Sequence, residues 1–237
     1  MFKRVSNIVI ILSVFGCGLT YTYSQSKVNF VEGNIAISKP SGYFAENISK
    51  SKIGAELGFL RQLKIEKPLF WGVSVYYHVL GSGSAEIIEV LDFQVVDFNY
   101  TTNSQMLGFN GKMRIYPDLR LGNLEFYAEA LLGYKWFFTK TRKTIIGDGD
   151  SFDSFVEKGD VSLTYGVALG LNYPCTQNLY LNLRVNYLPG LSIPYYVKNN
   201  VTSVNYSSIE FFDIKRSTTD IIRWDMGVTW KFTKLFQ

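Results

Sequence analysis

The chain has 237 residues, of which 24 are basic and 20 acidic, so its formal net charge is +4. The basic residues form no run or stripe that could follow a phosphate backbone, and this excludes nucleic acid as an expected partner. Aromatic residues make up 16% of the chain and proline contributes only 6 residues, a bias that favours β-structure, and no change of composition marks a domain boundary.

The N-terminus has the pattern of an export signal. Lys3-Arg4 precedes an apolar run over residues 9–19, and a polar stretch follows as far as Gln25. The run is shorter than the roughly 20 residues that a spanning helix needs, and this order is typical of a secretory signal peptide. We therefore predict a cleaved signal peptide at residues 1–25 and a single barrel domain at residues 26–237, with lipidation at Cys17 as the alternative.

The mature chain alternates apolar with polar or small residues over long stretches, as in Glu125–Phe138. Most of these stretches are about twice as long as the five or six residues usual in soluble proteins, and long enough to cross a bilayer at a tilt. The pattern predicts strands at Val28–Ile37, Lys52–Leu63, Leu69–Leu80, Gln105–Tyr116, Glu125–Phe138, Asp160–Tyr173, Asn178–Leu188 and Thr219–Thr233.

The predicted connections alternate between short and long. The short ones are Lys64–Pro68, Pro117–Asn123 and Pro174–Gln177, and the long ones are Ser38–Ser51, Gly81–Ser104, Thr139–Gly159 and Pro189–Thr218. This asymmetry is typical of bacterial outer-membrane barrels. We predict an all-β, antiparallel up-and-down transmembrane barrel of about 8 strands. Two partly strand-like stretches, Glu86–Tyr100 and Val201–Lys215, could form hairpins above the barrel or raise the number to ten.

One face of the strands is apolar, and we expect it to meet lipid. Aromatic rings should then gather at the two interfaces, with aliphatic side chains between them. The predicted girdles consist of Trp71, Tyr77, Phe126, Trp136, Tyr173, Tyr187, Trp224, Trp230 and Phe232. The alternative is a water-soluble barrel with the same face turned inward.

The opposite face carries acids and bases in near balance. They are Glu32, Glu56, Lys112, Arg114, Glu125, Glu129, Lys135, Arg184, Arg223, Asp225 and Lys231. An eight-stranded barrel has an interior only wide enough for side chains, so charges there must pair with one another. This favours a filled, salt-bridged interior over a conducting pore.

The last strand carries a pattern that suits recognition during assembly. Asp225, Gly227, Trp230 and Phe232 fit the order polar-x-Gly-x-x-aromatic-x-aromatic, although five residues follow Phe232. With its strand pattern, the chain resembles the OmpA/OmpX-type small barrels and the PorT-like outer-membrane β-barrel proteins of Bacteroidota over nearly the whole mature length. The resemblance implies insertion by an assembly machinery of the BAM type that recognises the last strand.

His78 is the only histidine of the chain, which excludes multi-histidine metal sites. Ser82 and Ser84 follow it, so a lipid-modifying barrel enzyme that uses His78 is an alternative, as is a narrow porin-like channel. We expect no catalytic residue, metal or cofactor. The predicted function is that of a non-enzymatic integral outer-membrane barrel with long extracellular loops, which either bind a partner or serve a structural role in the envelope. Its expected partners are outer-membrane lipid, the assembly machinery and a protein bound at the outward loops by strand addition.

Overall fold

The computed structural model describes residues 27–48, 50–65, 67–91, 93–146, 151–201, 203–204 and 207–233. The predicted signal peptide and the lipidation candidate Cys17 lie outside the described residues. No helix in the described part of the chain is long and apolar enough to span a membrane.

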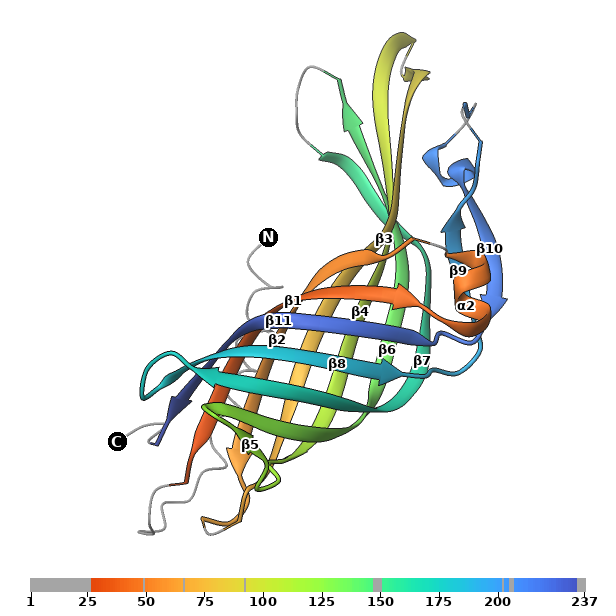
Figure 1. The fold of residues 1–237 in the computed structure, drawn as a ribbon. Coiled ribbons are helices and arrows are strands. Elements are labelled where there is room, and N and C mark those ends of the chain that lie inside the picture. Colours follow the sequence, from red (N-terminus) through yellow and green to blue (C-terminus); the bar gives the residue numbers. More distant parts are fainter. Residues whose placement is uncertain are drawn as a thin grey trace.

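Among the described residues, eight long strands form a closed antiparallel ring (Figure 1). In ring order they are β1 (Asn29–Pro40), β2 (Lys52–Gln62), β3 (Leu69–Leu91), β4 (Gln94–Ile115), β6 (Leu124–Ile145), β7 (Ser151–Pro174), β8 (Leu179–Leu188) and β11 (Ile221–Phe232). Each strand pairs with its neighbour along this order, and β1 closes the ring by pairing with β11 from Asn29↔Phe232 to Pro40↔Ile221. The two-residue strand β5 (Arg120–Leu121) pairs with the start of β6. The predicted barrel is confirmed, with eight strands in the ring and not ten.

Two hairpins rise beyond the ring (Figure 1). In one hairpin β3 pairs with β4 as far as Leu91↔Gln94, and in the other β6 pairs with β7 as far as Thr144↔Ser151; β4 also pairs with β6 as far as Phe98↔Ile145. We call this part the rim extension, defined as residues 81–91, 93–104, 139–146 and 151–159, and the end of the barrel that carries it the upper end. The prediction of loops over Gly81–Ser104 and Thr139–Gly159 is therefore wrong, because strand pairing continues through most of both segments. The alternative of a hairpin above the barrel at Glu86–Tyr100 is confirmed.

A second hairpin unit stands beside the ring at the upper end. β9 (Ile193–Lys198) pairs with β10 (Phe212–Ser217), and the 3-10 helix η1 (Ser208–Phe211) precedes β10. In Figure 1 this hairpin stands next to α2 (Gly42–Asn47), a short helix in the connection from β1 to β2. Among the described residues of the strand-like stretch predicted at Val201–Lys215, only the end from Phe212 is a strand, and it pairs with β9 and not with the ring.

The barrel wall turns its apolar side chains outward. Along β1, Val31 and Ile35 are exposed, whereas Glu32 and Asn34 are buried inside the barrel. The same alternation along β8 exposes Leu181 and Leu183. Since adjacent residues of a strand point to opposite faces, the pattern sends the polar face into the ring. The alternative of an interior lined by this apolar face is wrong.

Candidate functional site in the barrel lumen

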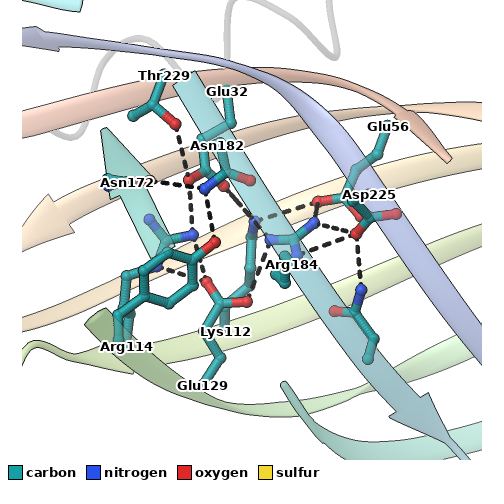
Figure 2. Close-up of polar contacts among 12 residues, drawn as sticks. Glu32, Glu56, Lys112, Arg114, Glu129, Asn172, Asn182, Arg184, Asp225 and Thr229 are labelled. Atoms are coloured by element: carbon teal, nitrogen blue, oxygen red, sulfur yellow. Dashed lines mark hydrogen bonds and ion pairs between the residues drawn. The ribbon is translucent and has the colours of Figure 1, made fainter. Parts of the chain in front are cut away.

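The middle of the lumen is filled by a cluster of ionised side chains that we call the charge cluster. It consists of Glu32 of β1, Glu56 of β2, Lys112 and Arg114 of β4, Glu129 of β6, Arg184 of β8, and Arg223 and Asp225 of β11. Figure 2 shows most of these side chains pointing toward one another from different strands. Their side chains are buried, with an exposed fraction of at most 1%.

Arg184 lies at the centre of the charge cluster. Its Nη2 atom is 2.5 Å from Glu56 Oε1 and 2.6 Å from Asp225 Oδ2, and its Nη1 atom is 3.1 Å from Glu129 Oε2. One planar guanidinium therefore joins carboxylates that come from three different strands. An arginine suits this place because its donors are fixed in a fork and it stays charged when buried.

The other cations complete the pairing. Lys112 Nζ lies 2.8 Å from Glu32 Oε2 and 3.3 Å from Glu56 Oε1. Arg114 Nη2 lies 2.6 Å from Glu32 Oε1 and 2.5 Å from Glu129 Oε1, and Arg223 contacts both Glu56 and Asp225. Each carboxylate thus has at least two cationic neighbours, which offsets the large cost of removing its charge from water.

Neutral side chains support the charges. Asn182 Nδ2 donates to Tyr127 Oη at 2.6 Å and to Asn172 Oδ1 at 2.8 Å, while Asn186 Nδ2 donates to Asp225 Oδ2 at 2.7 Å. The Arg114 guanidinium lies 3.9 Å from the centroid of the Tyr127 ring, a cation–π contact. None of these neutral residues was predicted as part of the site. The alternation of the strands places the asparagines on the inward face and could have indicated them.

Glycine provides the space for one of these rings. A Cβ atom at Gly170 would lie 2.3 Å from Tyr127 Cζ, so only a residue without a side chain fits opposite the tyrosine.

Apolar layers close the lumen on both sides of the charge cluster. Toward the upper end, Phe44 of α2 packs edge-on against Phe137 and Tyr195, with ring centroids 5.9 Å and 5.1 Å away. This upper layer also contains buried residues of the wall: Tyr76, Leu80, Met106, Leu131 and Leu188. The lower layer is built from Phe30, Leu60, Phe70 and Tyr180. The lumen is therefore filled by side chains along its length.

Two cavities lie at opposite ends of the barrel, beyond the side chains that fill the lumen. The lower one, of about 370 Å³, is lined by Phe30, Phe70, Tyr180 and others at the end of the short turns. The upper one, of about 410 Å³, lies where β2 begins beside β9. Within the described residues, neither cavity is lined by a member of the charge cluster, so neither leads into the middle of the barrel.

Not all of the predicted inward charges join the charge cluster. Lys135 is buried, but its Nζ donates to the carbonyl oxygens of Leu188 at 2.7 Å and Thr219 at 2.5 Å, nearer the upper end. Glu125 and Lys231 line the lower cavity and are partly exposed there. Their strand positions place them too close to the barrel ends to reach the centre, which alternation alone does not reveal.

Most of the predicted girdle residues point outward. Trp71, Tyr77, Trp136, Tyr173, Tyr187, Trp224 and Trp230 are exposed, whereas Phe126 and Phe232 are partly buried and Phe126 lines the lower cavity. Their place at bilayer interfaces stays a prediction.

The residues of the predicted assembly pattern also have places in the barrel wall. Asp225 belongs to the charge cluster. A Cβ atom at Gly227 would lie 2.0 Å from the carbonyl oxygen of Gly33, so a residue with a side chain does not fit there. Recognition of this strand by an assembly machinery also stays a prediction.

His78 contacts a serine that sequence reasoning did not select. Its Nε2 atom lies 3.1 Å from Ser38 Oγ, and both residues are buried. The predicted Ser82 and Ser84 are exposed in the rim extension. In the described part of the chain, no carboxylate hydrogen-bonds to His78 Nδ1 and neither cavity is lined by His78 or Ser38. Of the three groups of a catalytic triad, the described residues thus supply a serine and a histidine in contact but no carboxylate at Nδ1.

The fold is an eight-stranded up-and-down β-barrel with a filled lumen, as far as the described residues show. No family model and no curated protein matches the chain. Solved structures that are similar include a major outer membrane protein from Thermus thermophilus, at 10% identity and a TM-score of 0.48 over 86% of this chain and 99% of that one. OprG from Pseudomonas aeruginosa is 14% identical with a TM-score of 0.44 over 89% and 98%. Neisserial surface protein A is 11% identical with a TM-score of 0.38 over 88% and 97%.

Proposed function

We propose that the chain is an integral outer-membrane barrel that is non-enzymatic, does not conduct, and acts through the parts above its upper end. The proposal of a membrane location rests on the outward face of the ring. Exposed leucine, valine, isoleucine and tryptophan side chains cover that face continuously from strand to strand. Soluble monomers rarely expose apolar patches larger than a few hundred Å², so a lipid environment fits this surface better than water.

The proposal that the barrel does not conduct ions rests on its closed lumen. An ion crossing it would have to displace the apolar upper layer, separate Arg184 from its carboxylates and then pass the lower aromatic layer. Separating a buried pair exposes unpaired charge at a cost of several kcal/mol. The filled interior therefore supports a structural or binding role over a porin-like one.

The rim extension is the part that we propose contacts a protein partner. Beyond His78, β3 forms strand pairs only with β4 in the described residues, so above Ser82, whose carbonyl oxygen accepts from Lys198, one edge carries no further strand. Ile88, Val90 and Val95 near the tip are at least 70% exposed. An open strand edge beside apolar side chains suits an extended segment of a partner that adds a further strand.

Conductance in a planar lipid bilayer tests the closed lumen. Folding of the protein is first verified by its heat-dependent migration on SDS gels, which folded membrane barrels show. We expect no stable current steps in KCl above those of the same preparation after boiling. Steps that grow in proportion to KCl concentration, seen only with the folded protein, would contradict the proposal and favour a channel.

A further inference from the structure

The upper cavity, of about 410 Å³, is lined by lysines from separate parts of the chain. Lys50 precedes β2, Lys52 is its first residue, and Lys198 is the last residue of β9; all three line the cavity. The charges of Lys50 and Lys198 both act on Lys52, which is half-buried. The fold thus brings three ammonium groups to one opening although Lys198 is far from the others in sequence.

These ammonium groups lack carboxylate partners. In the described residues none of the three forms an ion pair, and no acidic residue lines the cavity. Lys198 Nζ donates to the carbonyl oxygen of Ser82 at 2.6 Å, which leaves further protons on that nitrogen. Elsewhere Lys143 pairs with Glu89 at 2.6 Å. Because the three like charges repel one another, an anion bound among them would offset this repulsion.

The walls of the cavity are held in place before any ligand binds. Lys52 pairs with Ser38 of β1, and Lys198 pairs with Phe212 of β10. Asn47, which also lines the cavity, donates from Nδ2 to Tyr195 Oη at 2.9 Å and so ties the end of α2 to β9. A preformed site loses less free energy to ordering when a ligand binds.

We propose that this cavity binds the phosphate group of a phosphorylated sugar. A phosphate offers three acceptor oxygens and nearly two negative charges to the lysines, and such charge-assisted hydrogen bonds are the strong ones. The exposed amide of Asn200 and the side chain of Tyr196 line the same cavity and suit the hydroxyl groups of a sugar. The volume lies within the range of sites that hold small molecules.

Two sources can supply this chemistry: the headgroup of a phosphorylated glycolipid, or a free sugar phosphate. Ile53 follows Lys52 directly and is 72% exposed on the outward face, so the cavity lies immediately above the apolar belt. This position favours the lipid source, and that preference, unlike phosphate binding itself, rests on the proposed membrane location.

Titration calorimetry on the folded, detergent-solubilised protein tests the proposal with glucose 6-phosphate, glucose, lipid A, and lipid A without its phosphates as probes. We expect a phosphate-bearing probe to bind and its unphosphorylated counterpart not to bind, with affinity that falls as salt rises. Loss of one charge-assisted contact should weaken binding about tenfold in Lys50→Gln and in Lys52→Gln. Lys215→Gln, an equal charge change at an exposed site on β10 outside the cavity, should bind as the unchanged protein does.

Heat-dependent migration confirms that each variant is folded before binding is compared. Binding of lipid A alone would support the site with a lipid headgroup as its source, and binding of glucose 6-phosphate as well would support it with phosphate as the shared determinant. Absence of binding by every phosphate-bearing probe would overturn the proposal. So would an equal loss in Lys215→Gln, because binding would then follow total charge and not this cavity.

Discussion

At the scale of single residues, the charge cluster depends on contacts shared among several strands. Arg184 contacts Glu56, Glu129 and Asp225, and the Arg223 guanidinium neighbours two of these acids. A buried pair is weak support for stability as a whole, but removing one partner leaves an uncompensated buried charge. Removal of the central arginine should therefore destabilise the charge cluster more than removal of any other member.

We expect Arg184→Met, which keeps an unbranched apolar stem but removes the guanidinium, to lower the free energy of unfolding by about 3–5 kcal/mol. Urea unfolding in lipid vesicles, followed by tryptophan fluorescence, measures this change. Arg216→Met, at an exposed position of β10, serves as the control and should change stability by less than about 0.5 kcal/mol. Equal stability of the two variants would mean that the cluster is not held by Arg184.

The inward charges themselves could be predicted because strand alternation assigns each side chain to a face. Their pairing could not, because the partners of Arg184 lie on strands that are distant in sequence, such as Glu56 at 128 positions away. For Lys135, alternation predicts the inward direction of the side chain but not its partners. These are the carbonyl oxygens of Leu188, at the end of β8, and of Thr219, in the connection from β8 to β11.

At the scale of elements, the ring and the hairpin at Glu86–Tyr100 were predictable, whereas the other parts above the ring were not. The rim extension contains Thr102 and Thr141, whose hydroxyls lie 2.7 Å apart across β4 and β6. Such polar stretches lack the apolar alternation that marks the wall and resemble loops in sequence. α2 has only six residues, too few for a helical period to show.

The role of α2 is to place Phe44 in the upper layer, and this can be tested with a neighbouring aromatic residue. Phe44→Ala removes a buried ring, a change that usually costs about 3–5 kcal/mol. Because α2 lies outside the ring, we expect the loss to appear as faster hydrogen exchange in α2 and β9, with heat-dependent migration of the barrel retained. Tyr43→Ala, at a position 67% exposed, should leave exchange unchanged. Slow exchange in both variants would show that Phe44 does not hold the upper layer.

At the scale of the whole molecule, burial is inverted relative to a soluble protein. Charged side chains such as Glu32 and Arg114 fill the middle of the interior between two apolar layers, while leucines and tryptophans are exposed on the outside. The interior can hold these charges because each carboxylate contacts at least two bases, and the apolar exterior suits the lipid environment that we propose. Because strand alternation couples the two faces, a charged interior goes with an apolar exterior. The environment of the tryptophans on the exterior therefore tests the whole arrangement.

Quenching of tryptophan fluorescence by brominated lipids tests this whole-molecule arrangement. All 4 tryptophans of the chain, Trp71, Trp136, Trp224 and Trp230, are exposed on the outward face. Since indole rings favour the interface, we expect bromine near the headgroups to quench them more than bromine near the chain ends. Leu183→Trp, in a variant whose native tryptophans are changed to phenylalanine, should reverse this order because Leu183 lies midway along β8. If bromine at neither depth quenched either protein, the outward face would not contact acyl chains, and the proposed membrane location would fail with it.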